Sequence, residues 1–293
     1  MRFSEIYSTA DSPVISFEVF PPKTSRGMDS LREVLPRLAA LEPRFMTVTY
    51  GAMGTTRIRT VEIASMIHNE FELECACHLT CVGAHSDQID AQLDHISRHG
   101  IENIVALRGD PPQGQDSFQA VKGGFSYANE LVAHIRSRGG FDLAVGGYPE
   151  KHVEAPDLDT DLSNLVRKVN SGADVVITQL FYDNDCFFRF LEEVRERGIT
   201  CPVIPGLLPI HSLTQVEKIA GLCGAEVPSE LQDRLGSAGD DPEAAAAAGV
   251  DWCIEQCAGL LEAGVEGIHY YVLNKSEVME KVIAGLRARE LII

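Results

Sequence analysis

The sequence lacks basic clusters and long apolar runs. Its 25 Lys and Arg residues are outnumbered by 43 Asp and Glu residues, which gives a net charge of −18. Nucleic acids and anionic membrane surfaces are poor partners for such a chain, because no local basic patch offsets the charge. No stretch approaches the roughly 20 apolar residues that a membrane span needs. Residues 1–13 also lack the apolar core of a signal peptide, so we expect a cytoplasmic protein.

A disulfide framework is also absent from the pattern of the eight cysteines. Cys75, Cys77 and Cys81, with His78 between them, would suit a zinc site by residue type. Side chains alternate between faces along a strand, however, so the three cysteines share one face and His78 lies on the other. We therefore expect no structural metal. A metal-dependent enzyme that uses these four residues is kept as an alternative hypothesis.

The remaining pattern is a repeat of apolar strands and amphipathic helices. With 45% hydrophobic residues the chain can build a full core. Most strands begin about 30 residues after the preceding one, which is the size of one βαβ step. Extra helical material, including the alanine run 244–248, fills residues 228–261 before the last strand. The predicted strands are 14–20, 45–50, 74–81, 103–110, 142–148, 174–180, 202–208 and 267–273.

Eight βα units in about 250 residues are typical of a closed parallel barrel. We predict an α/β fold, a (β/α)8 TIM barrel with extra helices before the last strand, and a single catalytic domain over residues 1–293. The alternative is an open doubly wound sheet, but no G-x-G-x-x-G motif follows the first strand.

Active sites of such barrels lie at the C-terminal ends of the strands. Polar residues occur at that end of six predicted strands: Glu18, Thr49, His78, Arg108 with Asp110, Tyr148 and Gln179. By alternation Ser16 and Glu18 point into the barrel, while Ile15, Phe17 and Val19 pack outward. A buried Glu18 needs partners or a raised pKa, and either makes it a candidate proton donor.

The segment Arg108-Gly109-Asp110 permits two interpretations when taken alone. An Arg can bind a planar or anionic group with two parallel hydrogen bonds, and Gly lets a ligand approach the backbone. The simpler interpretation is a surface Arg108–Asp110 ion pair beside a turn glycine.

Eight segments, one on each predicted strand, resemble the methylenetetrahydrofolate reductase family. They occur in the family's order and cover nearly the whole chain. The segments are 17–23 (FEVFPPK), 48–52 (VTYGA), 78–81 (HLTC), 106–110 (ALRGD), 148–150 (YPE) with His152, 177–181 (ITQLF), 204–209 (IPGLLP) and 269–271 (HYY) with Leu273 and Asn274.

The resemblance implies a flavoprotein of one-carbon metabolism and methionine biosynthesis. Its FAD is reduced by NADH or NADPH, which leaves before the folate enters the same place. The reaction is then the ping-pong reduction of 5,10-methylenetetrahydrofolate to 5-methyltetrahydrofolate. Both partners are small molecules, and family members are often homo-oligomers.

The resemblance also implies roles for individual residues. Glu18 is the general acid that protonates the folate nitrogen, Asp110 meets both flavin and pterin, and Gln179 contacts both the nicotinamide and the pterin. Gln215 and Lys275 match further folate-contacting positions. The matched cofactor-binding positions are Thr49, Tyr50, Ala52, His78, Arg108, Gly109, Asp110, Tyr127, Ala128, Tyr148, His152, Asp161, Asn164 and Lys168.

Spacing supports part of this assignment, because Asp161, Asn164 and Lys168 share one helix face. That face could bind the ribose and diphosphate of FAD, and a solvated helix stripe is the simpler alternative. Two residues depart from some family members: Ile219 replaces a Phe, and Lys275 replaces an Arg. The sequence also leaves no room for an appended regulatory domain, so control by S-adenosylmethionine is not expected. A non-catalytic flavin- or folate-binding module is the remaining alternative.

Overall fold

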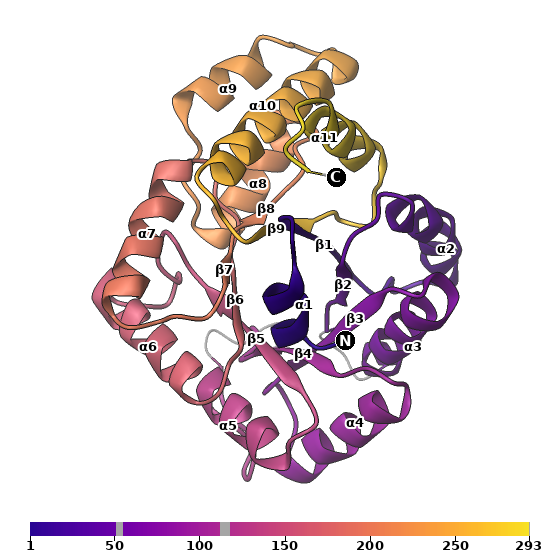
Figure 1. Ribbon diagram of the computed structural model, residues 1–293, viewed down its shortest axis with the longest axis vertical. Helices are drawn as coiled ribbons and strands as arrows, with labels where there is room; N and C mark the ends of the chain where they lie inside the picture. Colours follow the sequence, from indigo (N-terminus) through magenta and orange to yellow (C-terminus); the bar gives the residue numbers. More distant parts are fainter. Residues whose placement is uncertain (51–54, 112–117, 293) are drawn as a thin grey trace.

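The computed structural model of the protein describes residues 1–50, 55–111 and 118–292, and it places the described strands in one parallel sheet surrounded by helices (Figure 1). Every strand pairs in parallel with its neighbours, in the order β7-β6-β5-β4-β3-β2-β1-β9-β8. The strands are β1 (Val14–Val19), β2 (Phe45–Val48), β3 (Glu74–Thr80), β4 (Asn103–Leu107), β5 (Asp142–Gly147), β6 (Val175–Thr178), β7 (Val203–Ile204), β8 (Gly206–Leu207) and β9 (Gly267–Tyr271).

The predicted seventh strand, 202–208, is divided into two short strands at Pro205. Proline has no N–H to donate to a sheet ladder, so pairing is interrupted there. The first part, β7, pairs with β6, and the second part, β8, pairs with β9. The two ends of the strand order are therefore consecutive pieces of one strand, and the sheet closes on itself. The predicted (β/α)8 barrel is confirmed, and the open doubly wound sheet is wrong.

The helices lie outside the sheet, except for α1 (Figure 1). As expected, extra helices precede the last strand, and the alanine run lies in α10, which Asp241 caps by accepting from the backbone N–H groups of Glu243 and Ala244. The helices are α1 (Phe3–Thr9), α2 (Ser25–Ala39), α3 (Thr55–Phe71), α4 (Ser86–Arg98), α5 (Ala128–Arg138), α6 (Leu158–Asn170), α7 (Asn184–Glu196), α8 (Leu213–Cys223), α9 (Ser229–Gly236), α10 (Pro242–Glu262) and α11 (Glu277–Ala288). No helix within the described part of the chain is both long and apolar enough to cross a membrane.

Helix α1 was not predicted, and it closes the barrel at the N-terminal ends of the strands (Figure 1). The backbone N–H of Phe3 donates to Asn103 Oδ1 at 2.8 Å, and that of Ser4 donates to Asp142 Oδ2 at 2.8 Å. These bonds satisfy N–H groups of the first helical turn that have no partner within the helix. Phe3 is fully buried with its ring centroid 5.1 Å from that of Phe45. This end of the barrel is therefore closed by apolar packing.

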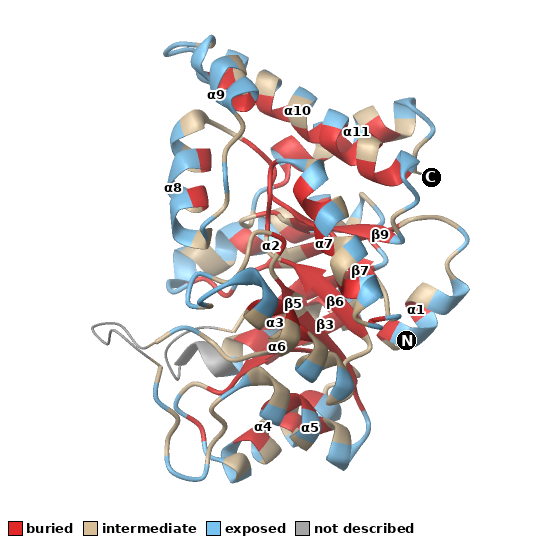
Figure 2. Ribbon diagram, turned by 90° about the vertical axis from the view of Figure 1, so that its left-hand side faces the viewer, coloured by how far each residue is buried: buried red, intermediate tan, exposed pale blue. Residues whose placement is uncertain are grey.

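Buried residues are concentrated on the strands and on the sheet-facing sides of the helices (Figure 2), and the alternation of side chains along the strands divides them into two layers. Ile15, Phe17 and Val19 belong to the larger cluster between sheet and helices, as predicted. A smaller cluster fills the barrel interior near α1, and Val14 and Phe45 belong to it. Polar side chains replace this inner core toward the opposite end of the strands, which is where the candidate site lies.

Candidate active site

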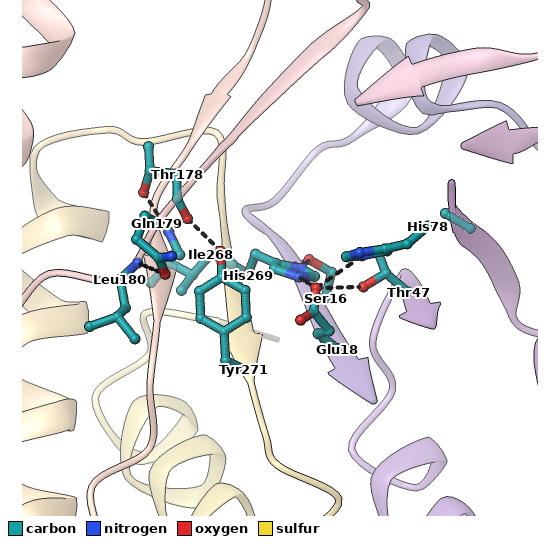
Figure 3. A network of polar contacts seen from close by, with 12 residues as sticks. Ser16, Glu18, Thr47, His78, Thr178, Gln179, Leu180, Ile268, His269 and Tyr271 are labelled. Carbon is teal, nitrogen blue, oxygen red and sulfur yellow. Dashed lines mark hydrogen bonds and ion pairs between the residues drawn. The ribbon is translucent and has the colours of Figure 1, made fainter. Parts of the chain in front are cut away.

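Glu18, at the end of β1, is the centre of a polar cluster inside the barrel (Figure 3). Its Oε2 lies 3.1 Å from His78 Nε2, accepts a hydrogen bond from Thr47 Oγ1 at 3.2 Å, and lies 3.5 Å from His269 Nε2. The side chain is 17% exposed. Its other oxygen, Oε1, forms no hydrogen bond or ion pair with a residue that the structure describes. One carboxylate oxygen is thus held, and the other is free to meet a ligand.

The strand register explains why these residues meet. Ser16 is paired with His269 across β1 and β9, and Glu18 is paired with Thr47 across β1 and β2. Residues that are paired across neighbouring strands point to the same face of the sheet, so these side chains all point into the barrel. Ser16 Oγ lies 2.8 Å from His269 Nδ1, and both residues are fully buried. We call Ser16, Glu18, Thr47, His78 and His269 the Glu18 cluster.

The charges of the cluster control the proton on Glu18. Burial by itself raises the pKa of the Glu18 carboxyl, but the positive charge of His78, with hydrogen bonds and charge from both histidines, outweighs it and lowers the pKa well below its usual range. The partners of this buried carboxyl therefore stabilise its charged form, and its pKa is not raised.

Arg108 pairs with Glu154 and not with Asp110. Its two terminal nitrogens each lie 2.6 Å from an oxygen of Glu154, and this pair raises the pKa of Arg108. The local ion-pair interpretation is therefore wrong. Gly109 has φ of +85°, and a Cβ there would lie 2.6 Å from Val82 Cγ2, so only glycine fits. Asp110 is exposed beyond this turn.

A second polar group lies between the end of β5 and helix α6. The Lys168 ammonium donates to the carbonyl of Gly146 and lies 5.4 Å from the centre of the Tyr148 ring. Burial lowers the pKa of Lys168 to about 8, although Asp161 acts in the opposite direction. Asp161 Oδ2 accepts the backbone N–H of His152 at 3.1 Å. Among the described residues no carboxylate forms a salt bridge with Lys168.

Aromatic contacts and burial complete this group. Tyr148 and His152 pack edge to face, with ring centroids 4.6 Å apart. Burial raises the pKa of Tyr148 to about 12 and lowers the pKa of His152. The predicted helix is confirmed as α6, which also carries the half-buried Asn164. Of its three predicted residues, Lys168 contacts the carbonyl of Gly146 in β5, and Asp161 contacts the backbone of His152 in the loop that follows.

The remaining predicted folate-contacting residues come after β6 in the chain, and Gln179 lies next to the end of β5, because its backbone N–H donates to the carbonyl of Gly147 at 2.8 Å. Gln179 follows β6, and its Oε1 accepts the backbone N–H of Leu180 at 2.9 Å. Gln215 is occupied by its own loop, since Oε1 accepts from His211 N at 2.7 Å and Nε2 donates to Pro209 O at 3.3 Å. Lys275 is exposed, while Ile219 packs in the cluster beneath α8. These residues do not contact the Glu18 cluster.

The other predicted cofactor residues are dispersed around the same end of the barrel. The carbonyl of Thr49 accepts from Thr60, and the Tyr50 hydroxyl donates to Gln92 of α4 at 3.0 Å. Tyr127 is 62% exposed and precedes Ala128, the first residue of α5. Ala52 lies outside the described residues.

The alternative zinc site is not formed. Cys75 and Cys77 are buried in the outer cluster, where burial raises the pKa of Cys77 to about 12. His78 instead turns inward to Glu18, as the alternation of strand faces predicted. Within the part of the chain that the structure describes, no group of three or more His, Cys, Asp or Glu side chains could hold a metal ion.

Sequence reasoning did not assign roles to His269, Thr47, Ser16 or Glu154. Ser16 and Thr47 do share the inward alternation face with Glu18 and Thr49, so a signal for them was present. His269 lies in a motif that supported the family resemblance, but only the register of β1 against β9 places it on Glu18. Glu154 follows His152 in a loop, and no pattern points to its bond with Arg108.

A closed parallel barrel of this kind defines the TIM-barrel class. Its titratable side chains gather at the C-terminal ends of the strands, which is where this class has its active sites. The family model described as methylenetetrahydrofolate reductase matches residues 2–287. The chain therefore belongs to the methylenetetrahydrofolate reductase family.

Individual relatives agree with this assignment. The chain is 44% identical over 270 residues to "Methylenetetrahydrofolate reductase (NADH) 1" of Arabidopsis thaliana, covering 88% of this chain and 46% of the relative. It is 36% identical over 275 residues to "5,10-methylenetetrahydrofolate reductase" of Escherichia coli, covering 94% of this chain and 91% of the relative. The chain thus spans about half the length of the plant relatives it matches and nearly all of the bacterial one.

A solved structure supports the fold. An uncharacterized protein from Clostridium thermocellum, described as binding two copies of 5-methyl-5,6,7,8-tetrahydrofolic acid, superposes with a TM-score of 0.65 at 16% identity over 99% of both chains. At this identity the likeness concerns the barrel alone.

Proposed function

We propose that this chain, acting as one catalytic domain, reduces 5,10-methylenetetrahydrofolate to 5-methyltetrahydrofolate, with FAD as bound cofactor and NADH or NADPH as reductant. The nicotinamide and the folate would use one site in turn. Membership of the family supports the reaction. The observation that supports it most directly is the Glu18 carboxyl at the active-site end of the barrel: its Oε2 is held by three side chains, and its Oε1 has no hydrogen bond or ion pair with a described residue.

The residues at this end suit FAD. The half-buried Lys168 ammonium has a carbonyl partner and no salt-bridged carboxylate among the described residues, so an anionic diphosphate would complete its environment. Gly109 exposes backbone beside Arg108 where a side chain would not fit. Lys168, Asp161 and Asn164 would hold the ribose and diphosphate, and Arg108, Gly109 and Asp110 would hold the ring system. When bound, the flavin would supply hydride transfer between nicotinamide and folate.

Glu18 would supply the proton that the folate requires after first taking one up, because its histidine partners keep the carboxyl ionised beforehand. As one C–N bond of the five-membered folate ring breaks, its electron pair stays on the nitrogen, which takes the proton from Glu18. The other nitrogen forms the C=N⁺ group that can accept hydride. The carboxylate that remains is stabilised at Oε2 by Thr47, His78 and His269. Such a positioned acid typically contributes about 10²–10⁴ in rate.

Asp110 and Gln179 would orient the two substrates. The exposed Asp110 carboxylate disfavours further negative charge beside it, which would favour hydride donation from a reduced ring system. The Gln179 amide nitrogen, whose Oε1 is held by Leu180 N, can donate to a carbonyl of either substrate. The names of the plant relatives specify NADH, which supports NADH as the first reductant to test.

The experiment separates the two half-reactions. Purified protein with FAD is mixed anaerobically with NADH or NADPH, and the flavin absorbance is followed as it bleaches. Methylenetetrahydrofolate is then added, and the return of the absorbance reports folate reduction. Both steps are expected in the wild-type protein. Protein that binds no FAD, or whose flavin is not reoxidised by the folate, would contradict the proposal and favour a binding module.

Glu18→Gln tests the assigned acid. It should leave flavin reduction within about threefold and slow folate reduction by about 10² or more, because the amide cannot donate the required proton. If folate reduction by the variant matches the wild-type protein, Glu18 is not the acid.

A further inference from the structure

A cleft of about 1190 Å³ lies among the outer helices, where α7 faces α9 and α10 (Figure 1). Its walls come from the loop after β5, from α6 and α7, and from the chain between Gly224 and Gln256. None of its described lining residues belongs to the Glu18 cluster or to the predicted cofactor- and folate-contacting residues. The cleft is large enough for a small organic molecule, and the proposed function does not use it.

Two hydrogen-bonding atoms in the wall of this cleft have no protein partner. The Tyr182 hydroxyl, on a side chain that is 2% exposed, and Asn184 Oδ1 form no hydrogen bond with a residue that the structure describes. Asn184 is fixed in orientation, because its Nδ2 donates to the carbonyl of Gln256 at 2.9 Å. Its Oδ1 can therefore only accept a hydrogen bond, and the Tyr182 hydroxyl can also accept one. Buried polar atoms of this kind normally have a partner, which a ligand can supply.

The charge of the cleft decides which kind of ligand fits, because carboxylates outnumber the basic side chains along its lining. Arg234 already forms salt bridges with Glu230 and Glu255. Lys151 donates to two backbone carbonyls, and Arg189 is exposed to solvent. An anionic ligand would therefore meet little free positive charge and an excess of negative charge.

Glu150, Asp183 and Glu226 form the acidic part of the cleft, and no described residue forms a salt bridge with them. Burial raises the pKa of Glu150, and the charges of Glu226 and Asp183 act in the same direction against the charge of Arg189. Glu150 Oε1 accepts the backbone N–H of Glu226 at 2.9 Å, which leaves Oε2 for another donor. Burial also raises the pKa of the Tyr182 hydroxyl, and Glu150 adds to this, so the two groups lie within electrostatic range. A cation bound here would relieve the repulsion among the carboxylates.

We propose that this cleft binds a small organic ammonium ion, whose N–H groups donate to the Glu150 carboxylate and the Tyr182 hydroxyl. An ammonium group has only donors, which matches acceptors that lack partners. A metal ion does not fit, since the described residues here and elsewhere contain no group of three or more His, Cys, Asp or Glu that could hold one. The carbon body of the ligand would pack on Leu158, Phe190 and Trp252, which line the same cleft. This inference does not depend on the proposed function.

The test uses Trp252, which is the only tryptophan of the chain and therefore reports on the cleft alone. Its fluorescence is followed while 2-phenylethylamine is titrated into the purified protein, and we expect a saturable change with a Kd of about 1 mM. The uncharged analogue 2-phenylethanol should bind at least about tenfold more weakly, because it lacks the charged donor. If the amine does not bind, or if the alcohol binds as tightly, the inference is wrong.

Two variants locate the binding. Glu150→Gln keeps an oxygen for the N–H of Glu226 but removes the charge, so it should raise the Kd for the amine by about tenfold or more. Tyr182→Phe should raise that Kd by about 2–10-fold. Its urea midpoint should stay unchanged or rise, because the hydroxyl that it removes has no described protein partner.

Glu262→Gln, on an exposed position of α10 outside the cleft, is the matched control and should leave the Kd unchanged. If Glu150→Gln and Tyr182→Phe bind the amine as tightly as the wild-type protein, the ligand does not use this cleft and the inference is wrong. Equal weakening in Glu262→Gln would also overturn it, since the amine would then respond only to the net charge of the protein.

Discussion

Lys168→Met should make the cofactor-free protein more stable while weakening its affinity for FAD. Methionine keeps most of the length and apolar area of the lysine side chain and removes the ammonium. In the folded protein that ammonium is half-buried, and it donates to a carbonyl instead of a carboxylate. The variant therefore removes a charge that forms no salt bridge with a described carboxylate and that a bound anion would compensate more fully.

The magnitude follows from the shift of the Lys168 pKa from 10.5 to about 8. A lowered lysine pKa means that folding disfavours the charged form, so the full cost applies below the folded pKa and disappears as the pH rises toward the unfolded value. With partial solvent screening, this cost is about 1–3 kcal/mol at pH 7. The lost hydrogen bond to a charged group should raise the Kd for FAD by about 10-fold or more.

Two measurements check this prediction. Urea unfolding of apoprotein should show a higher free energy of unfolding for Lys168→Met at pH 7, with the difference narrowing above pH 8. Quenching of flavin fluorescence on titration should show the weaker binding. Lys281→Met, on the exposed face of α11, is the matched control and should change neither quantity. An unchanged Kd for FAD in Lys168→Met would refute the assignment of Lys168 to the diphosphate.

Three further variants test other parts of the molecule. Phe3→Ala should lower the free energy of unfolding by about 3–5 kcal/mol in urea, because it empties the packing under the barrel; a loss below about 1 kcal/mol would contradict the sealing role of α1. Gly109→Ala should lower the flavin content of purified protein, since φ of +85° costs an alanine about 1–2 kcal/mol and its Cβ meets Val82; full flavin occupancy would count against the site. Glu154→Gln should change stability by less than about 1 kcal/mol, because Glu154 is 47% exposed, and should lower the Kd for FAD by freeing Arg108; weaker FAD binding would show that Glu154 itself supports the cofactor.

The barrel could be predicted because each strand and helix has its own local pattern. Regular spacing and alternation identified the strands, and the same alternation placed Ser16 and Glu18 inside. Helix α1 could not be found in this way, because it is short and its first N–H groups bond to Asn103 and Asp142, more than 90 residues away in the chain. Its stability comes from tertiary contacts.

The site was predictable as a location but not as a set of contacts. Polar residues at the strand ends indicated where the candidate site lies. Which of them touch depends on register, and His269 reaches Glu18 across 251 positions of sequence. Likewise Arg108 had a nearby carboxylate in Asp110, yet loop geometry gave it Glu154 instead. Sequence distance is thus a poor guide to ion pairs at a barrel mouth.

The interruption at Pro205 makes the barrel wall uneven around its circumference. Between β6 and β9 the wall is joined partly through side chains: Thr178 Oγ1 accepts from Gly206 N at 2.9 Å, and the Tyr271 hydroxyl donates to Thr178 O at 2.5 Å. Side-chain links of this kind open more readily than a continuous backbone ladder. The adjoining residue is Gln179, which we assign to both substrates, and α8 begins shortly after β8. Under the proposed function, the residue that would contact both substrates therefore stands beside a part of the barrel wall that is held by fewer backbone hydrogen bonds and opens more readily.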